Sequence, residues 1–257
     1  MSTILVTGGT GTLGNDLLRA IADRGHQVRV MTRSPERATV PEGVEVVQGD
    51  LANGDGVDLA VKGADAVIHA ASAPRDSMHV DMEGTRRLVV SAAEADVRHL
   101  LYVSIVGVDV VPYSYYRAKF AAEQIVAIGR VPWSVQRLTQ FHPFVDSVLE
   151  KLSAGPVTAV PMSVPLQPIS TADAARCLLA ALDAGPSGLL PDKGGPRIES
   201  FAELATQWRR ARRSGGGVLA VPLPGGLARA LRGGGATCTN GVVEGDSFGN
   251  WLAARPR

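Results

Sequence analysis

The chain of 257 residues has few cysteines, few aromatic residues and no excess of either charge. Its two cysteines, Cys177 and Cys238, are too few for a disulfide framework. No apolar run approaches the roughly 20 residues that cross a bilayer. The 26 lysines and arginines nearly balance the 25 aspartates and glutamates, which leaves no general attraction to nucleic acid or to an anionic membrane. These absences exclude a disulfide scaffold and a membrane-spanning protein.

Signals for export and for metal binding are also missing. The first residues, MSTILVTGG, lack the basic stretch, long apolar run and cleavage site of a secretory signal, so a cytoplasmic protein is expected. His69 has no Cys, His or paired carboxylate beside it in sequence, and no metal site is predicted. We expect a partner that is a small-molecule substrate, no binding to nucleic acid or membrane, and a monomer or homodimer.

Aromatic residues make up only 5% of the chain, yet three of its four tyrosines lie within four positions. These are Tyr113, Tyr115 and Tyr116. A chain with so little tyrosine has concentrated it in one segment, which is therefore a candidate for chemistry.

Short apolar runs alternate with stretches of helical period over most of the chain. We predict strands at Ile4–Thr7, Gln27–Thr32, Val44–Gln48, Ala66–Ala70, His99–Val103 and Trp133–Leu138. Helices are predicted at about residues 12–24, 55–62, 81–95, 114–129 and 141–154. This alternation predicts an α/β protein with a doubly wound parallel sheet and helices on both faces.

A glycine-rich turn, Thr7-Gly8-Gly9-Thr10-Gly11-Thr12-Leu13-Gly14, joins the first predicted strand to the first predicted helix. Glycine there lets the backbone turn sharply, admits a pyrophosphate and packs the helix close to the strand. The free N–H groups at the start of the helix attract phosphate. The turn predicts a dinucleotide-binding site formed by Gly8, Thr10, Gly11, Thr12, Leu13 and Gly14.

The end of the second strand indicates which dinucleotide is bound. An acidic residue there would bind the adenosine ribose and favour NAD, but the sequence has Arg33, followed by Arg37. Both arginines can make charge-assisted contacts to a 2′-phosphate, so NADP(H) is preferred. The alternative is that they only project into water from a loop.

The ends of the third and fourth strands add further cofactor contacts. Asp50, followed by Leu51, could accept a hydrogen bond from the adenine amino group, or it could cap a helix. The small residues Ala70, Ala71 and Ser72 let the backbone approach a flat ligand at the sheet edge. His69, just before them, is expected to be a hydrogen-bonded structural histidine.

Tyr115 and Lys119 are four residues apart and therefore share a face of the predicted helix. A phenol is a poor acid at neutral pH, but a nearby ammonium favours the phenolate and moves the group toward the working range. The pair could therefore exchange a proton with a substrate oxygen. The alternative is an amphipathic helix with one aromatic residue in the core and a surface lysine.

These features together resemble the short-chain dehydrogenase/reductase superfamily, and more closely its atypical NmrA-like, NAD(P)H-binding branch. The resemblance rests on the glycine turn, Arg33, Asp50-Leu51, His69 to Ser72, Tyr115-x-x-x-Lys119 and Arg137 to Phe141. It implies a Rossmann-type fold, with Tyr115 as catalytic acid/base and Lys119 as ligand of the nicotinamide ribose. It covers about residues 1–185 well and the glycine-rich tail poorly.

The resemblance also implies a carbonyl-polarising serine and a substrate wall. Ser104 is the expected catalytic serine, although the serine run common in active members is missing; Ser114 could substitute, or the chain could lack such a group. The segment after the sixth strand is expected beside the nicotinamide and the substrate. The predicted substrate-binding residues are Tyr113, Tyr116, Gln140, Phe141 and His142.

The chain is thus expected to be an oxidoreductase with an NADP(H)-binding core, residues 1–155. Four prolines between positions 156 and 168 and two glycine triplets further on interrupt the remainder, which is predicted to complete the fold and form a small substrate-side lobe, residues 156–257. The leading hypothesis is NADPH-dependent hydride transfer to a small or medium carbonyl, quinone or enone-like acceptor. The alternative is a non-catalytic NADP(H)-binding redox sensor or regulator of the NmrA-like type.

Overall fold

A computed structural model of the chain describes residues 1–161, 163–213 and 215–255. These residues form two compact units, and the chain passes between them several times. Unit 1 comprises Met1–Ser104, Ser114–Arg137 and Ala174–Leu190; unit 2 comprises Ile105–Tyr113, Leu138–Asp173 and Pro191–Arg257. The segment that follows residue 155 thus contributes to both units, since Ala174–Leu190 belongs to unit 1 and Pro191–Arg257 to unit 2.

Unit 1 is built on a parallel sheet of seven strands in the order β10-β6-β5-β4-β1-β2-β3. The strands are β1 (Thr3–Thr7), β2 (Gln27–Thr32), β3 (Glu45–Gln48), β4 (Ala66–His69), β5 (His99–Ile105), β6 (Trp133–Leu138) and β10 (Gly188–Leu189). The chain reverses its direction of progress between β1 and β4, where doubly wound sheets bind ligands. The predicted doubly wound fold is confirmed.

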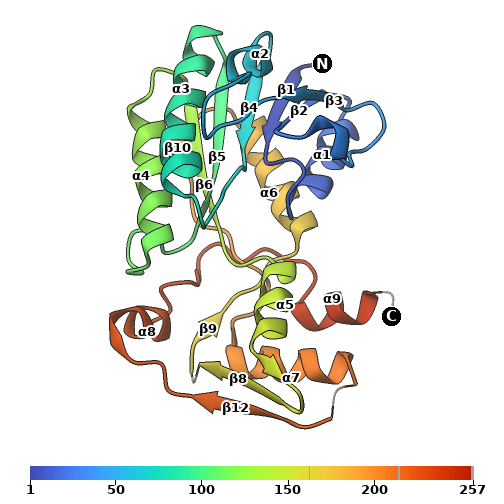
Figure 1. Ribbon diagram of the computed structural model, residues 1–257, viewed down its shortest axis with the longest axis vertical. Coiled ribbons are helices and arrows are strands. Elements are labelled where there is room, and N and C mark those ends of the chain that lie inside the picture. Colours follow the sequence, from blue (N-terminus) through green and yellow to red (C-terminus); the bar gives the residue numbers. More distant parts are fainter. Residues whose placement is uncertain (162, 214, 256–257) are drawn as a thin grey trace. The chain divides into compact units, whose positions relative to one another are not determined.

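Helices cover both faces of this sheet (Figure 1). Leu5 and Met31 face a buried cluster that includes Val57, Leu88 and Val126, so the helices α2 (Val57–Val61), α3 (Thr85–Glu94) and α4 (Ser114–Ile128) pack on one face. The helices α1 (Gly14–Ala22) and α6 (Thr171–Asp183) lie on the other face and are linked by an ion pair between Arg24 and Asp183.

A short 3₁₀ helix, η1 (Pro35–Arg37), follows β2, and a π-helical segment, η2 (Met78–Gly84), precedes α3. A helix beginning at residue 81 was predicted, whereas the α-helix itself begins at Thr85. The wider π-helical turn buries Asp81, which is 0% exposed. π-Helical turns of this kind occur often at functional sites.

The described residues of unit 2 form short strands and four helices. A three-stranded sheet has the order β12-β8-β7, formed by Gly217–Val221, Val157–Pro161 and Ser153–Ala154, and β11 (Glu199–Ser200) pairs with β9 (Pro165–Leu166). The helices are α5 (His142–Lys151), α7 (Phe201–Ala211), α8 (Gly225–Arg232) and α9 (Phe248–Ala254). The apolar faces of α5, α7 and α9 meet around Leu149, Leu204, Trp208 and Phe248. In the part of the chain that the structure describes, no helix has the length and hydropathy required to traverse a membrane.

Candidate functional site

The glycine-rich turn after β1 is held against the end of β4. Gly8 has a positive φ of +74°, and a Cβ at this position would lie 2.6 Å from the backbone nitrogen of Ala71. A Cβ at Gly14 would lie 1.8 Å from the carbonyl oxygen of Gly9. Side chains are therefore excluded at both ends of the turn, for reasons of backbone contact.

The middle of the turn, in contrast, presents backbone to solvent. Thr10, Gly11 and Thr12 are exposed, and a Cβ at Gly11 would meet only the carbonyl oxygen of Gly8, at 3.1 Å. Leu13, at the N-cap of α1, makes no side-chain cap to the first N–H groups of the helix. An open, uncapped helix start behind a glycine turn fits the pyrophosphate of a dinucleotide.

The end of β2 carries positive charge. Arg33 is exposed and, among the described residues, makes no ion pair; Arg37 lies on η1 and pairs with its neighbour Glu36 at 3.6 Å. The guanidinium of Arg33 is thus available to an anion, whereas that of Arg37 is partly compensated. Both side chains are in unit 1, as is the glycine turn.

The loop after β3 is organised by Asp50 and Arg87. Asp50 Oδ1 accepts a hydrogen bond from the backbone N–H of Ala52 at 2.9 Å, and Leu51 is buried. Arg87 on α3 donates hydrogen bonds to the carbonyl oxygens of Leu51 and Ala52, each at 3.0 Å. Asp50 therefore caps its own turn, and a second carboxylate oxygen is left for another donor.

Tyr115, in the first turn of α4, is joined to the loop after β4. Its hydroxyl lies 2.5 Å from Ser72 Oγ, which donates a hydrogen bond to Asp81 Oδ1, also at 2.5 Å. The other carboxylate oxygen of Asp81 accepts from the backbone N–H of Ala73 at 3.0 Å. Tyr115 is half-buried and Ser72 is exposed, so the chain runs from a buried carboxylate to groups that reach solvent.

Lys119 lies one turn beyond Tyr115 and is 2% exposed. Its Nζ donates a hydrogen bond to the carbonyl oxygen of Val103 at 2.9 Å, lies 3.8 Å from Asp81 Oδ1 and stands over the Tyr102 ring, 4.1 Å from its centre. Burial lowers the pKa of Lys119 to about 8, against the opposing charges of Asp81 and Glu123. The lysine is thus a buried neighbour of the phenol, and the alternative of a surface lysine is excluded.

A buried column of hydrogen bonds connects β1 with η2. Thr85 Oγ1 donates to the carbonyl oxygen of Asp81, so it must accept from His69 Nε2 at 2.9 Å, and His69 Nδ1 must then accept from Thr7 Oγ1 at 2.7 Å. Burial, reinforced by the charge of Lys119, lowers the pKa of His69 to about 3. His69 is a neutral structural residue, as the sequence predicted, and it fixes the segment that carries Asp81.

Ser104 lies at the end of β5 and is 2% exposed. Its Oγ and the hydroxyl of Tyr102 are buried without a hydrogen-bond partner among the described residues. Burial raises the pKa of Tyr102 well above its usual value. An unpartnered buried hydroxyl is costly, so a ligand oxygen that reached Ser104 would satisfy it.

The remaining predicted residues have different surroundings. Tyr116 is half-buried, and its ring centre lies 6.2 Å from that of Tyr115. Tyr113, Gln140, Phe141 and His142 belong to unit 2. Tyr113 is exposed, Phe141 is half-buried, and Gln140 bonds to the carbonyl oxygen of Ala236 and the N–H of Gln167.

His142 is fully buried beside Phe248 and Trp251 in unit 2. Its Nε2 lies 3.3 Å from the carbonyl oxygen of Pro168, and burial lowers its pKa. A histidine in this setting stays neutral and packs as an aromatic ring, which is a structural environment rather than that of an exposed acid or base.

Asp81 is the residue that sequence reasoning missed. It was expected only as the first residue of an ordinary amphipathic helix. A buried aspartate four residues before a threonine that bonds back to its carbonyl is a local signal of a helix turn. Its partners Ser72 and Lys119 come from other elements, so the sequence contained no direct sign of the contact.

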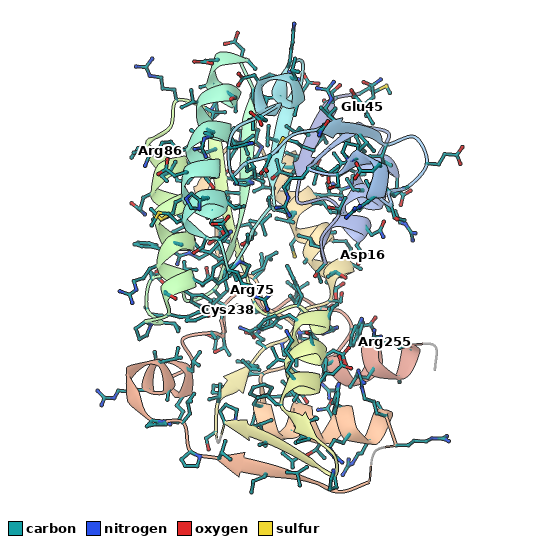
Figure 2. All side chains as sticks on the ribbon, viewed as in Figure 1. Asp16, Glu45, Arg75, Arg86, Cys238 and Arg255 are labelled. Atoms are coloured by element: carbon teal, nitrogen blue, oxygen red, sulfur yellow. The ribbon has the colours of Figure 1, made fainter. Side chains whose placement is uncertain are left out.

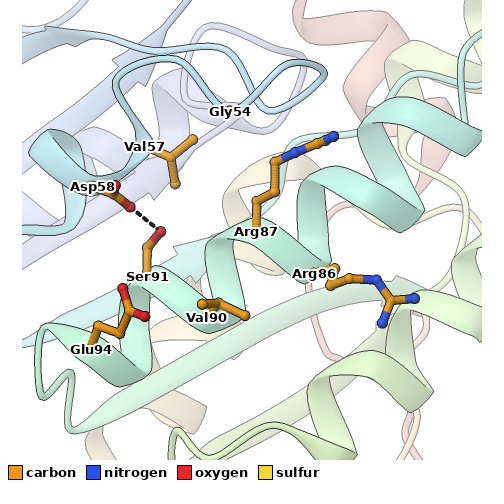
Figure 3. A pocket seen from close by; sticks show the side chains of 8 residues that line it. All are labelled: Gly54, Val57, Asp58, Arg86, Arg87, Val90, Ser91 and Glu94. Atoms are coloured by element: carbon orange, nitrogen blue, oxygen red, sulfur yellow. Dashed lines mark hydrogen bonds between the residues drawn. The ribbon is translucent and has the colours of Figure 1, made fainter.

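A pocket in unit 1 lies apart from this site. A shallow pocket of about 350 Å³ between α2 and α3 is lined by Gly54, Val57, Asp58, Arg86, Arg87, Val90, Ser91 and Glu94 (Figure 3). Two of its charged side chains already have partners, since Asp58 is bonded to Ser91 and Arg87 to the loop after β3. Within the described ranges, no three His, Cys, Asp or Glu side chains are grouped to bind a metal ion.

The carboxyl edge of the unit 1 sheet therefore gathers the candidate groups. Asp16 on α1 and Arg75 in the loop after β4 lie at this edge, and Glu45 lies at the opposite one (Figure 2). A glycine turn that fits a pyrophosphate, an adjacent basic residue and a tyrosine–lysine pair at one edge of a doubly wound sheet are typical of NAD(P)-dependent oxidoreductases of the short-chain dehydrogenase/reductase type.

Comparison with known proteins agrees with this class. Residues 8–184 match the NAD(P)H-binding family, and the chain belongs to that family. It is 34% identical over 212 residues to (4-alkanoyl-5-oxo-2,5-dihydrofuran-3-yl)methyl phosphate reductase of Streptomyces griseus, a match that covers 80% of this chain and 73% of the relative. It is 35% identical over 148 residues to 2-alkyl-3-oxoalkanoate reductase of Stenotrophomonas maltophilia, covering 50% and 45% of the two chains.

The fold is also similar to that of solved structures. The enzyme WbmH of Bordetella bronchiseptica, in complex with NAD⁺, superposes with a TM-score of 0.72 over 99% of this chain and 97% of that one. The two sequences are 17% identical, so this likeness concerns the fold.

Proposed function

We propose that this protein is a reductase that uses NADPH to reduce a small or medium acceptor containing a carbonyl, quinone or enone group. The observation that carries the proposal is the Tyr115 hydroxyl, hydrogen-bonded at the carboxyl edge of the sheet and placed one helical turn from a buried lysine. A phenol so placed can give its proton to a substrate oxygen. The glycine turn in the same unit supports a dinucleotide as the hydride donor.

The cofactor would be held by the residues of three strand ends. The turn from Gly8 to Gly14 would bind the pyrophosphate, Asp50 and Leu51 the adenine, and Ala70 to Ser72 the flat rings near the nicotinamide. When bound, NADPH supplies the hydride. The protein's own contribution is to orient the two substrates, and to hold a proton at the Tyr115 hydroxyl while Ser104 and Lys119 position neighbouring oxygens.

The preference for NADPH over NADH rests on Arg33. An NAD-specific site uses a carboxylate at this position for the ribose, and a guanidinium there would bind a 2′-phosphate by charge-assisted hydrogen bonds. Its exposure and its lack of an ion pair among the described residues leave it free to do so.

The acceptor class is supported by the relatives. One is named for a substrate with an oxo group and an alkanoyl group on a dihydrofuran ring, the other for a 3-oxoalkanoate. Both names contain a carbonyl group, and the oxygen of a carbonyl gains charge when hydride adds to its carbon. A proton donor such as Tyr115 stabilises that charge in the transition state.

Turnover with a panel of acceptors tests the proposal. NADPH oxidation would be followed with 2-alkyl-3-oxo esters, butenolides carrying an acyl group, quinones and simple aldehydes. We expect one carbonyl-conjugated class to be reduced, and Tyr115→Phe to lower kcat about 100-fold or more with unchanged NADPH binding. Tight NADPH binding with no turnover on any acceptor would instead favour a redox sensor.

A titration tests the cofactor preference. We expect Arg33→Ala to weaken NADPH binding about tenfold or more and NADH binding little, because only NADPH has the 2′-phosphate. Arg19→Ala, which removes an exposed arginine from α1, is the matched control and should change neither affinity. Equal losses for both cofactors would remove the role assigned to Arg33.

A further inference from the structure

Asp81 is a fully buried carboxylate that contacts Lys119 and is linked to Tyr115 through Ser72. One oxygen accepts from Ser72 and faces Lys119 at 3.8 Å, and the other accepts from the N–H of Ala73. The π-helical turn of η2 and the column through Thr85 and His69 fix its backbone. The carboxylate is therefore built into unit 1 rather than placed there by a flexible loop.

The direction of the hydrogen bonds follows from the chemistry of the carboxylate. An ionised aspartate only accepts, so the Ser72 hydroxyl must donate to Asp81. Its oxygen is then the acceptor of the 2.5 Å contact with Tyr115, and the tyrosine must be the donor. This arrangement requires a proton on the phenol, because a phenolate has none to donate.

The surrounding charges act in the same sense. Lys119 on α4 favours the phenolate, but Asp81 on η2 faces it and offsets its charge. Glu123, also on α4, adds negative charge that Arg137 on β6 compensates by two hydrogen bonds. His69 on β4 is neutral, because burial lowers its pKa. Tyr102 on β5 keeps its proton, because burial raises its pKa. The ring of Tyr116 also lies beside Tyr115 and carries no charge at neutral pH.

We propose that Asp81, acting through Ser72 and against Lys119, holds Tyr115 in its protonated form and so sets this site to donate a proton at neutral pH. Asp81 and Ser72 are positioning residues for the acid, and Ser72 has this role in addition to any contact with cofactor. The consequence for catalysis rests on the proposed reductase function. A site of this kind favours reduction, in which the phenol must arrive protonated, over oxidation, which needs the phenolate as base.

An amide at position 81 would reverse the arrangement. Asp81→Asn keeps the size of the side chain and an acceptor for Ala73, but its NH₂ group donates to Ser72. The Ser72 hydroxyl then turns toward Tyr115 and stabilises the phenolate, while Lys119 loses its counter-charge. Both changes favour ionisation of the phenol.

The first experiment is an ultraviolet titration of phenolate in the protein without acceptor, with the Tyr115→Phe titration subtracted. We expect Asp81→Asn to move the apparent midpoint of the Tyr115 transition down by about one pH unit or more. Lys119 titrates nearby, so the midpoint belongs to the coupled pair. The control is Asp76→Asn, which removes a half-exposed carboxylate that pairs with His79 and should leave the midpoint in place.

Ser72→Ala decides the direction of the hydrogen bond without changing charge. Loss of an acceptor from the phenol lowers the midpoint, whereas loss of a donor to the phenolate raises it, so we expect a smaller downward shift. An upward shift, or none in either variant, would overturn the proposal. Because Ser72 is exposed, this variant also serves if Asp81→Asn does not fold.

The pH profile of reduction provides the catalytic readout. We expect its alkaline limb to begin at lower pH in Asp81→Asn than in the wild type, while NADPH affinity changes little. Downward phenolate midpoints in a protein that reduces no acceptor would contradict the proposed function and leave the inference about Tyr115 standing. Normal turnover with unchanged midpoints would do the reverse.

Discussion

Each unit of the protein contains a buried aspartate with several polar partners, Asp81 in unit 1 and Asp146 in unit 2. Asp146 lies on α5 and accepts hydrogen bonds from Trp208 at 2.6 Å, Arg212 at 2.9 Å and Arg255 at 2.6 Å. Both arginines also stack on tryptophan rings, Arg212 on Trp208 and Arg255 on Trp251. Among the described residues, none of these three partners is hydrogen-bonded to a candidate catalytic group.

Asp81 differs because its hydrogen-bond network continues through Ser72 to Tyr115. Its hydroxyl partner Ser72 is exposed and passes the hydrogen bond to a half-buried phenol, and its cation lies at 3.8 Å rather than in a close pair. A carboxylate surrounded by strong donors is satisfied and stabilises the fold. A carboxylate that is hydrogen-bonded to a rotatable hydroxyl beside a titratable group can also influence whether that group keeps its proton. This is how the surroundings of Asp81 differ from those of Asp146.

The largest effect on the free energy of unfolding is expected at Glu123, a buried carboxylate of unit 1. Glu123, on the same helix as Lys119, receives two hydrogen bonds from Arg137, and both side chains are at most 8% exposed. Glu123→Gln would remove the carboxylate that neutralises the buried Arg137 guanidinium and should lower the free energy of unfolding by about 3 kcal/mol. Denaturant unfolding measures this. If instead only the pH profile moved, proximity to Lys119 rather than saturation would determine the role of a carboxylate here.

Asp146→Ala is expected to cost somewhat less. It removes the acceptor of the Trp208 N–H and of two arginines, but Arg212 and Arg255 are 39% and 49% exposed and can turn to water. We therefore expect a loss of about 2 kcal/mol in unfolding free energy, with NADPH affinity unchanged. Asp183→Ala, at the exposed pair with Arg24, is the control and should cost far less. A change in NADPH affinity would contradict a purely structural role.

The sequence predicted most of unit 1 because its signals are local. The strands Gln27–Thr32 and Trp133–Leu138 have the predicted ends, since each contains β-branched valine and follows a segment with a glycine, Gly25 before the first and Gly129 before the second. The edge strand β10 was missed: it has two residues, Gly188 and Leu189, and is defined only by its pairing with β6. In unit 2, β12 pairs with β8 across some sixty positions of sequence, which no periodicity can indicate.

The candidate site divides in the same way. The spacing of Tyr115 and Lys119 is a property of one helix, and the glycine turn is one segment, so both could be recognised before the structure. The contact between Ser72 and Asp81 joins a loop to a π-helical turn, and the contact with Lys119 joins two elements from different parts of the chain. Side chains that meet only through the fold leave no pattern in the sequence.

A smaller change in unfolding free energy per pH unit is expected from His69, whose hydrogen bonds with Thr7 and Thr85 support the segment that carries Asp81. The pKa of His69 is lowered to about 3 in the fold, so the unfolded chain binds an extra proton between that value and about 6.5. Stability attributable to His69 is full above the unfolded value and falls on acidification, by at most about 1.4 kcal/mol per pH unit. His69→Gln should flatten the acid side of the stability profile, measured by denaturant unfolding at several pH values. His79→Gln, at an exposed histidine, should not.

The smallest effect on unfolding free energy is expected at the half-buried carboxylate of Asp65, whose cationic partner is exposed. Asp65 accepts from the Thr3 N–H at 2.8 Å and pairs with Arg98; the hydrogen bond from Thr3, opposed by burial and aided by Arg98, lowers its pKa. Arg98 is 71% exposed, so Arg98→Ala should change the unfolding free energy by less than about 1 kcal/mol, an effect that salt screens. Unfolding at low and high ionic strength measures it. A loss as large as that of Asp146→Ala would mean that the number of partners, rather than exclusion of water, determines what a carboxylate contributes in this protein.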